Sequence, residues 1–465
     1  MPGKDTTDTI QRLQEAIGAQ KVLSSLEDRI AYSYDGTFEQ NLPDLAVLPE
    51  STDDVAAVVR IAAELGVPIV PRGMASGLAA ASVPFGGGIA LSLTRMDRIL
   101  EIDEENYTVR VEAGVITADL ETAVGELGLF YPPDPSSNKQ STIGGNIACN
   151  AGGPRCLKYG VTGDYVMGLT VVLPDGEVLQ TGGKAIKNVV GYDLTSLFVG
   201  SEGTLGVITE ALLRLTAMPQ VVRTARAEFP ALEDASRAVN AVLQTGVVPA
   251  TLELMDETAI ACIEEAMGLG LPLDVEAMLI IESDGSDEQA VVREIETAAR
   301  VCRQNGAREV IVATTEEERD QLWRARRSVS PSLARKAPNK LGEDITVPRS
   351  AIPEAVRRIK AIGIDYGLPI VIFGHAGDGN LHPNILFDKR EDEQWEKVEQ
   401  MVGEIFQVAL DLDGTLSGEH GVGTLKRPYM ERAVGSLSLD IQRRIKEALD
   451  PHNILNPGKV IPERL

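Results

Sequence analysis

Pro71-Arg72-Gly73-Met74-Ala75-Ser76-Gly77-Leu78 is the stretch that decides the fold of the first half of the chain. It overlaps the end of an apolar run, Val67–Pro71, which predicts a buried strand. Its glycines let the backbone approach a ligand closely, and successive N–H groups can form a nest for phosphate oxygens. Arg72 would add a charge-assisted hydrogen bond to the phosphate groups, for example those of a pyrophosphate, that this nest binds. Taken alone, one such loop is more often a turn than a phosphate cradle.

Further glycine-rich and proline-rich stretches change that balance. They are Pro132–Ser136, Ser141–Asn146 and Asn150–Pro154, all within the first half of the chain. None of them has the G-x-G-x-x-G or the G-x-x-x-x-G-K-[ST] spacing of the common nucleotide-binding motifs. Their clustering nevertheless predicts a cofactor site that grips phosphate groups with backbone.

Helices and strands alternate around these loops. Ser51–Asp54 is a helix-capping sequence, and the apolar residues that follow recur at the helical period as far as Leu65. Ile89–Leu93 predicts another buried strand. Ile99–Asp103 and Tyr107–Val111 are apolar runs on either side of a short polar turn, which indicates a hairpin.

The pattern changes at about residue 220. Strand-like runs at Thr251–Leu254, Ala277–Ile281 and Val310–Ala313 are separated by capped amphipathic helices such as Ser286–Gln304. This predicts an antiparallel α+β domain with helices on one face of its sheet. The tail, from about residue 426, is predicted to be helical.

All four histidines of the chain lie in its last part, and three of them belong to two compact motifs, Gly374–Asn384 and Ser417–Gly421. The first motif is a turn between two apolar runs, which predicts a hairpin. His375 and His382 would then face each other across the mouth of the hairpin, with Asn384 on the same strand face as His382.

Glu419 adds a carboxylate to these two imidazoles. Two histidines and one glutamate form a ligand set that suits zinc, iron or manganese and can leave a position open for substrate. His420, the next residue, would point elsewhere and serve as a base. The alternative is that these histidines are ordinary hydrogen-bonded loop residues.

Composition limits the partners. The formal charge of −25 argues against binding to nucleic acid or to an anionic membrane surface, although an acidic surface could dock onto a basic protein. The four cysteines have no C-x-x-C spacing, so an iron–sulfur cluster in this chain is not expected. The sequence predicts neither a secretory signal nor a membrane-spanning helix, and therefore a cytoplasmic protein or one held to a membrane only by partners.

Two more motifs, Ala185–Asp193 and Phe198–Thr209, complete a resemblance that covers essentially the whole chain. With the glycine-rich loops, they are similar to the FAD-binding domain of the vanillyl-alcohol oxidase/para-cresol methylhydroxylase superfamily. The histidine motifs and the tail Leu455–Lys459 resemble the branch of FAD-linked 2-hydroxy-acid dehydrogenases that includes glycolate oxidase flavoprotein subunits and D-lactate dehydrogenases.

The resemblance implies an α+β fold in three parts. Residues 1–218 would form a para-cresol methylhydroxylase-type FAD-binding domain. Residues 219–425 would form a ferredoxin-like antiparallel α+β substrate domain, or cap domain, which carries the metal site. Residues 426–465 would form a helical segment that returns to the FAD domain and completes the flavin site.

The same resemblance assigns roles to individual residues. Glu202, Gly203 and Ile208 would lie near the adenosine half of FAD, and Asn456 near its ring. The remaining cofactor contacts would be Arg72, Gly73, Met74, Ala75, Ser76, Gly77, Leu78, Pro135, Ser136, Thr142, Gly144, Gly145, Asn146, Asn150, Gly152 and Gly153.

In the second half, the resemblance makes His375, His382 and Glu419 the metal ligands and His420 the catalytic base. Arg326 would grip the substrate carboxylate and takes part in catalysis. Ser330 and Asn384 fall at further substrate-contact positions.

The chain departs from the family pattern at two places. Ala75, Ser76 and Ala79–Ala81 replace residues of the usual glycine-rich loop, and alanine adopts a positive φ only at a cost. Gly342 stands where hydroxyglutarate-type relatives carry a lysine, which weakens a second cationic contact and favours small monocarboxylates.

The predicted function is therefore FAD- and metal-dependent oxidation of a small D-2-hydroxy acid, D-lactate or glycolate. Hydride would pass to the flavin, and electrons to an iron–sulfur subunit or an electron-transfer flavoprotein. FAD is predicted to be non-covalent because no histidine precedes His375. The alternatives are a dehydrogenase for D-2-hydroxyglutarate or another larger 2-hydroxy acid, and a metal-dependent hydrolase.

Overall fold

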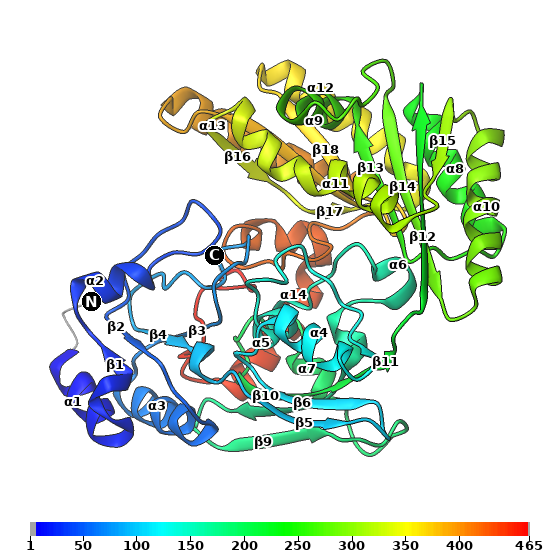
Figure 1. Ribbon diagram of the computed structural model, residues 1–465. Helices are drawn as coiled ribbons and strands as arrows, with labels where there is room; N and C mark the ends of the chain where they lie inside the picture. Colours follow the sequence, from blue (N-terminus) through cyan, green and yellow to red (C-terminus); the bar gives the residue numbers. More distant parts are fainter. Residues whose placement is uncertain (1–5, 464–465) are drawn as a thin grey trace. The chain divides into compact units, whose positions relative to one another are not determined.

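The computed structural model describes residues 6–463, which form two compact units. Unit 1 contains the chain up to Gly152, the segment Val161–Met218 and the chain from Glu419 onward. Unit 2 contains Gly153–Gly160 and Pro219–Gly418. The chain therefore passes between the units four times (Figure 1).

Unit 1 begins with a small sheet whose strand order is β1-β2-β4-β3. β2 and β3 run parallel to β4, whereas β1 is antiparallel to β2. The strands are β1 (Val22–Leu23), β2 (Leu45–Val47), β3 (Ile69–Arg72) and β4 (Ile89–Ser92). Helices α1 (Thr6–Ile17) and α3 (Thr52–Leu65) share one apolar core with this sheet, which includes Leu13, Val58, Leu45 and Ile89.

The boundaries of α3 confirm the capping prediction. Ser51 is the N-cap and its side chain accepts a hydrogen bond from the Asp54 N–H, while Gly66 ends the helix in the left-handed conformation.

The second sheet of unit 1 is antiparallel, with the order β5-β6-β10-β8-β9. It contains the predicted hairpin, in which β5 pairs with β6. Its strands are β5 (Ile99–Asp103), β6 (Thr108–Glu112), β8 (Val166–Val172), β9 (Val178–Gly182) and β10 (Val207–Arg214). The remaining elements of unit 1 are α2 (Leu26–Ala31), α4 (Thr117–Gly125), β7 (Leu129–Phe130), α5 (Ile143–Cys149), α7 (Leu194–Phe198), β11 (Thr216–Ala217) and α14 (Met430–Leu449).

The tail of the chain belongs to unit 1. Ile69 donates its N–H to the Ile454 carbonyl at 2.7 Å, and Asn456 donates its N–H to the Ile69 carbonyl at 2.7 Å. Residues 454–456 thus extend alongside β3, immediately before the glycine-rich loop (Figure 1). The predicted return of the C-terminal segment to the FAD domain is confirmed.

Unit 2 is built on one antiparallel sheet with the strand order β15-β12-β14-β13-β18-β19-β16, and β17 also pairs with β19. The strands are β12 (Val221–Phe229), β13 (Thr251–Asp256), β14 (Ala277–Gly285), β15 (Glu309–Val312), β16 (Asn339–Gly342), β17 (Ile345–Thr346), β18 (Ile370–His375) and β19 (Asn380–Phe387). Its helices are α6 (Cys156–Tyr159), α8 (Leu232–Gln244), α9 (Glu257–Met267), α10 (Glu288–Gln304), α11 (Glu316–Lys336), α12 (Ile352–Tyr366) and α13 (Asp392–Asp411).

Helices cover both faces of this sheet, so the prediction of helices on one face is wrong. α9 and α11 share a core with strand residues such as Met255, Met278 and Phe373. The neighbouring strand residues Leu254 and Leu279 face the other way and are also buried, beneath the helices α8, α10 and α12. The burial of all of β13 and most of β14 follows from this two-sided covering.

No helix among residues 6–463 combines the length and the apolar character that crossing a bilayer requires.

Candidate functional site

The hairpin of β18 and β19 brings two histidines together. In the register, Phe373 lies opposite His382, and His375 lies opposite Asn380, so the two histidines are diagonal neighbours rather than direct partners. Their Nε2 atoms are 3.3 Å apart, and the rings meet at 83°. Both side chains are almost fully buried. Two nitrogen atoms thus converge on one point inside unit 2.

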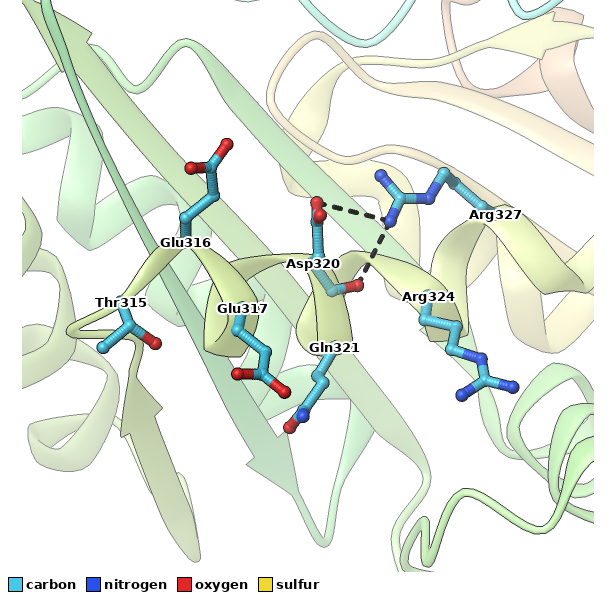
Figure 2. Close-up of a pocket in the computed structure, with 7 residues that line it drawn as sticks. All are labelled: Thr315, Glu316, Glu317, Asp320, Gln321, Arg324 and Arg327. Atoms are coloured by element: carbon cyan, nitrogen blue, oxygen red, sulfur yellow. Dashed lines mark hydrogen bonds and ion pairs between the residues drawn. The ribbon is translucent and has the colours of Figure 1, made fainter.

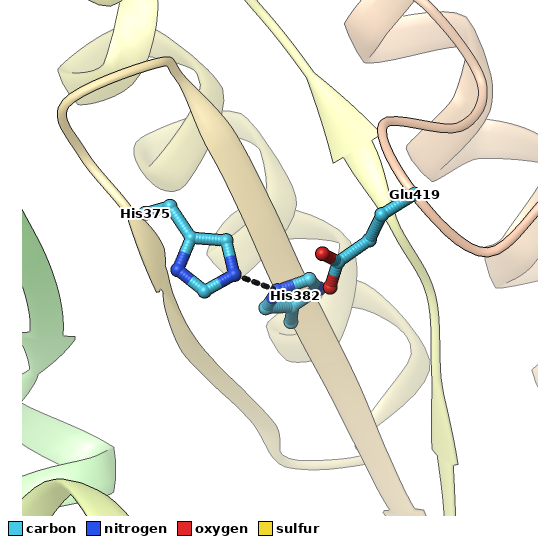
Figure 3. A group of neighbouring side chains, drawn as sticks. All are labelled: His375, His382 and Glu419. Carbon is cyan, nitrogen blue, oxygen red and sulfur yellow. Dashed lines mark hydrogen bonds between the residues drawn. The ribbon is translucent and has the colours of Figure 1, made fainter. Parts of the chain in front are cut away.

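Glu419 completes the group (Figure 3). It directly follows Gly418 of unit 2, whose N–H donates to the buried carboxylate of Asp344 at 2.9 Å. One ligand atom from each of His375, His382 and Glu419 lies within 4.8 Å of the others. This donor set and spacing fit a tetrahedral divalent metal with one position left for water or substrate.

A residue that the sequence did not single out holds this group in place. Glu253, on β13, lies opposite His375 in the sheet and is completely buried. Its Oε1 is 2.5 Å from His375 Nδ1, and its Oε2 accepts a hydrogen bond from Arg326 Nε at 2.7 Å. With the proton on Nδ1, Nε2 carries the lone pair that can bind a metal, and a carboxylate behind a ligand histidine is the usual arrangement.

The charges around Glu253 favour its ionised form. Burial alone would raise the pKa of this carboxyl, but the His375 imidazole and the Arg326 guanidinium beside it, which both hydrogen-bond to it, hold the pKa below its usual value. The sequence did contain one indication of this role. Glu253 lies inside the strand-like run Thr251–Leu254, and a carboxylate buried in a strand requires hydrogen-bonding or charged partners.

Two of the predicted substrate residues, Arg326 and Ser330, lie on α11, and the third, Asn384, lies on β19. The Arg326 guanidinium also packs over the Phe373 ring, 4.8 Å from its centroid. Asn384 is buried on β19 and donates from Nδ2 to the His382 carbonyl at 2.8 Å. Ser330, one turn after Arg326 on α11, is exposed and accepts a hydrogen bond from Lys340 Nζ at 2.5 Å.

Lys340 lies on the same strand as Gly342, the position at which hydroxyglutarate-type relatives carry a lysine. Burial lowers the pKa of this lysine, which stands on β16 two residues before Gly342. The Lys340 amine nevertheless hydrogen-bonds to Ser330, a predicted substrate contact, although the position named from the sequence is a glycine. A Cβ at Gly342 would lie 2.8 Å from Asn384 Oδ1, so a larger residue at this position would require the Asn384 side chain to shift.

His420 is separate from the three-residue ligand group. Its Nε2 lies 3.9 Å from Glu419 Oε1, and its side chain is 17% exposed, compared with 3% for His375. Some access to solvent suits a group that must exchange a proton.

The glycine-rich loop after β3 forms the centre of the cofactor residues in unit 1. Ala75 and Ala80 both adopt the left-handed conformation, with φ of 56° and 58°. A Cβ at Gly73 would lie 2.2 Å from Thr142 Oγ1, so the backbone of the first predicted cofactor loop packs against the side chain of Thr142. The alanine substitutions left the backbone conformation of this loop undecided from the sequence, and the structure shows that two of the alanines adopt a positive φ.

Arg72 is buried at the start of this loop. Its Nη1 donates to the Tyr32 carbonyl at 2.9 Å, and its Nε has no hydrogen-bond partner among the described residues. Burial lowers the pKa of Arg72, and the nearby Asp35 carboxyl opposes this effect only in part. A buried cation with a donor to spare fits the pyrophosphate of FAD.

Several predicted cofactor residues form one connected patch. Thr142 accepts the Gly145 N–H, and Asn146 donates to Thr117 Oγ1. Asn456 donates from Nδ2 to the carbonyls of Ala81 and Glu202.

The remaining cofactor candidates occupy loops, α5 and the start of β10 in unit 1, except Gly153, which belongs to unit 2. Met74, Ser76, Gly77 and Leu78 continue the loop after β3, Pro135 and Ser136 precede α5, Gly144 lies in α5, Asn150, Gly152 and Gly153 follow it, and Gly203 and Ile208 lie just before and in β10.

The Glu202 carboxylate does not point into open space. It accepts the backbone N–H groups of Val422 and Gly423 at 2.6 and 2.8 Å. Both of its oxygens are thus engaged by the segment that follows His420.

A surface hollow along the first half of α11 is not assigned a function (Figure 2). A single helix supplies its lining, and Arg327 is hydrogen-bonded to the Asp320 carbonyl within it. None of the predicted site residues lines this hollow.

Comparison with known proteins agrees with this architecture. Residues 43–182 match the model of the FAD binding domain, and residues 218–460 match that of the FAD linked oxidases, C-terminal domain. The chain belongs to the FAD-linked oxidases. It is therefore an FAD-dependent oxidoreductase.

Curated relatives extend over nearly the whole chain. The chain is 47% identical to "Glycolate oxidase subunit GlcD" of Bacillus subtilis, covering 98% of this chain and 97% of that protein. It is 37% identical to the protein of the same name in Escherichia coli K12, covering 99% and 92%. It is 35% identical to "D-lactate dehydrogenase" of Anaerostipes hadrus, covering 98% of each.

Solved structures show the same fold at low sequence identity. p-Cresol methylhydroxylase superposes with a TM-score of 0.81 at 18% identity, over 97% of this chain and 96% of that one. 4-Ethylphenol oxidase from Gulosibacter chungangensis gives 0.79 at 21%, over 98% and 97%. The predicted fold class, a para-cresol methylhydroxylase-type FAD domain with an antiparallel α+β second domain, is confirmed.

Proposed function

We propose that the chain oxidises a small D-2-hydroxy acid, D-lactate or glycolate, to the corresponding 2-oxo acid. The observation that carries the proposal is the single buried carboxylate of Glu253, which links the metal-type ligand His375 to the carboxylate-binding residue Arg326. The relatives named glycolate oxidase subunit and D-lactate dehydrogenase support the same substrate class.

The reaction removes a hydride from C2 of the substrate and a proton from its hydroxyl group, leaving a carbonyl. FAD, when bound, accepts the two electrons with the hydride. Arg326 provides a planar pair of donors for the substrate carboxylate and so fixes the orientation of C2. His420 accepts the hydroxyl proton, a contribution that is typically about 10²–10⁴-fold for a positioned base.

His375, His382 and Glu419 would hold a divalent metal, which we propose to be zinc, manganese or iron. A metal bound there supplies Lewis acidity toward the substrate oxygens. The cofactor residues named above, from Arg72 to Asn456 and without Glu202, would hold FAD without a covalent bond. A metal-dependent hydrolase does not account for the FAD-binding domain of this chain.

A larger substrate is the second candidate, and Lys340 is the observation that favours it. Its ammonium group on Ser330 would suit a distal carboxylate such as that of D-2-hydroxyglutarate. We further propose that electrons leave the flavin for a partner protein, either an iron–sulfur subunit or an electron-transfer flavoprotein. The word "subunit" in the names of two relatives supports such a partner.

The test is a panel of D- and L-2-hydroxy acids with an artificial dye as electron acceptor. Turnover of D-lactate or glycolate that a chelator abolishes, and that added divalent metal restores, supports the proposal. Turnover of D-2-hydroxyglutarate alone would favour the larger substrate. Absence of turnover with every hydroxy acid would overturn the proposed function.

A further inference from the structure

The candidate ligand Glu419 and the candidate base His420 lie on one short segment, Ser417–Gly423, which we call the bridge segment. It contains the point at which the chain leaves unit 2 and enters unit 1. Each end of the bridge segment is held by a buried carboxylate, and each of these contacts lies within one unit. Glu419 and His420 are between the two holding points.

Asp344 holds the unit 2 end. This side chain is completely buried between β16 and β17. Its Oδ2 accepts the Ser417 hydroxyl at 2.7 Å and the Gly418 N–H at 2.9 Å, and its Oδ1 accepts Asn380 Nδ2 at 2.6 Å. A Cβ at Gly418 would lie 2.4 Å from Thr346 Oγ1, so the backbone is confined on its other side as well.

Glu202 holds the unit 1 end. It is 6% exposed, and each of its oxygens accepts one backbone N–H, from Val422 and from Gly423. A Cβ at Gly421, the residue next to His420, would lie 2.9 Å from Glu202 Oε1. Burial raises the pKa of Glu202 above its usual value, so the fold keeps this carboxyl buried at an energetic cost.

The loop after β3 also contacts the end of the bridge segment, through the Ala79 carbonyl. A Cβ at Gly423 would lie 1.8 Å from the Ala79 carbonyl, and the N–H of Thr424 donates to that carbonyl at 3.0 Å. Lys459 donates to the carbonyls of Ala80 and Val83 at 2.6 and 2.8 Å and to Thr424 Oγ1 at 2.8 Å. The residues after His420 therefore have little freedom to move.

We propose that Glu202 and Asp344 are positioning residues with separate duties. Asp344 sets the position of Glu419 for metal binding, and Glu202 sets the position of His420 for proton transfer. This assigns Glu202 to the base rather than to the adenosine half of FAD. The inference rests on the proposed function, because that function is what makes His420 a base and Glu419 a metal ligand.

The physical reason is the sensitivity of catalysis to small displacements. A misplacement of about 1 Å in a catalytic group can cost about 100-fold in rate. A segment fixed by charge-assisted hydrogen bonds at both ends removes that error without any direct contact between the holding carboxylates and the substrate.

The experiment compares Glu202→Gln with Asp344→Asn in the full-length protein loaded with FAD. Each amide keeps the shape of the side chain but presents an NH₂ group to one donor that formerly met oxygen. In Glu202→Gln we expect wild-type metal and FAD content, an unchanged KM for the hydroxy acid, and kcat lowered about 10- to 100-fold. In Asp344→Asn we expect loss of bound metal with FAD retained.

Hydrogen exchange of the bridge-segment peptide gives a readout that does not depend on activity. Its amides should exchange faster in both variants than in the wild type. Glu112→Gln is the matched control, because Glu112 is buried in unit 1 and also accepts a backbone N–H, that of Arg98 at 2.9 Å. This control should leave kcat, metal content and bridge-segment exchange unchanged.

The outcomes that overturn the inference are distinct. They are a Glu202→Gln variant with kcat within two-fold of wild type, one that loses metal or FAD, or unchanged exchange in both variants. If Glu202→Gln fails to fold, Gly421→Ala, whose methyl group would press on Glu202, must show the fall in kcat instead. If the wild type oxidises no hydroxy acid, the proposed function fails, while metal content and hydrogen exchange still decide the positioning roles.

Discussion

Removing the Glu253 carboxylate tests the core of the site. Its side chain is 0% exposed, and its two partners are 3% exposed for His375 and 12% for Arg326, so solvent cannot replace the lost interactions. Breaking a buried ion pair by removing one partner costs about 3–5 kcal/mol. We therefore expect Glu253→Ala to lower the free energy of unfolding of unit 2 by that amount, or its unfolding temperature by roughly 6–20 °C.

Glu253→Gln separates stability from metal binding. The amide oxygen can still accept the His375 proton, so we expect a loss of only about 1.5–3 kcal/mol, the value of a hydrogen bond to a charged group. Affinity for divalent metal should fall about 10- to 100-fold, as it does when the carboxylate behind a ligand histidine is replaced. Urea unfolding followed by circular dichroism and calorimetric metal titration provide the two measurements.

Glu228→Gln is the matched control for this prediction. Glu228 is 2% exposed and pairs with Arg226 and Arg308 elsewhere in the same sheet. It should destabilise unit 2 without changing metal affinity. The reasoning is refuted if Glu253→Gln binds metal as tightly as the wild type, or if Glu228→Gln weakens metal binding equally.

Four further results are expected. His375→Ala and Glu419→Gln should each lose bound metal while their flavin absorption stays at the wild-type level; metal retained in both would refute the ligand assignment. His420→Ala should keep metal and FAD but slow flavin reduction by about 10²–10⁴-fold; loss of metal would make it a ligand instead. Acid precipitation should leave the yellow colour in the supernatant, whereas colour in the pellet would show a covalent flavin. Burial lowers the pKa of Lys459 from 10.5 to about 7, so the unfolded chain binds an extra proton between these values. Stability should therefore rise with pH in that window, by up to about 1.4 kcal/mol per unit, and Lys459→Met should flatten the rise in urea unfolding.

Local patterns were sufficient for many elements of the fold. The Ser51 cap and the helical period define α3, the alternation around residues 99–111 defines the β5–β6 hairpin, and turn composition at Ala376–Asn380 defines the β18–β19 hairpin. In each of these elements, the residues that predict the helix or hairpin lie within the element itself or directly beside it.

Contacts between distant parts of the chain were not predictable in this way. The short helix α6 joins unit 2 because Lys158 and Tyr159 bind the Asp284 carboxylate, more than a hundred residues away. The left-handed Ala80 contradicts the preference of alanine, and it is stabilised by a hydrogen bond from Lys459 to its carbonyl. Asp284 and Lys459 are both far away in the sequence from the residues they bind, so local patterns could not predict these contacts.

The candidate site shows the same division. The spacing of the histidine motif indicated His375 and His382, but not that His375 pairs with Asn380 across the hairpin. The contact between Glu253 and His375 could not be predicted, because it depends on the register between β13 and β18, which sequence periodicity does not determine.

The most direct test of hydroxy-acid oxidation is a single turnover without oxygen. The protein, loaded with FAD and a divalent metal, is mixed anaerobically with D-lactate, and the visible absorption band of the flavin is followed. We expect the band to bleach fully, with one 2-oxo acid formed per flavin, and the flavin of Arg326→Ala to bleach far more slowly. A flavin that a chemical reductant bleaches but that neither D-lactate nor glycolate reduces would contradict the account.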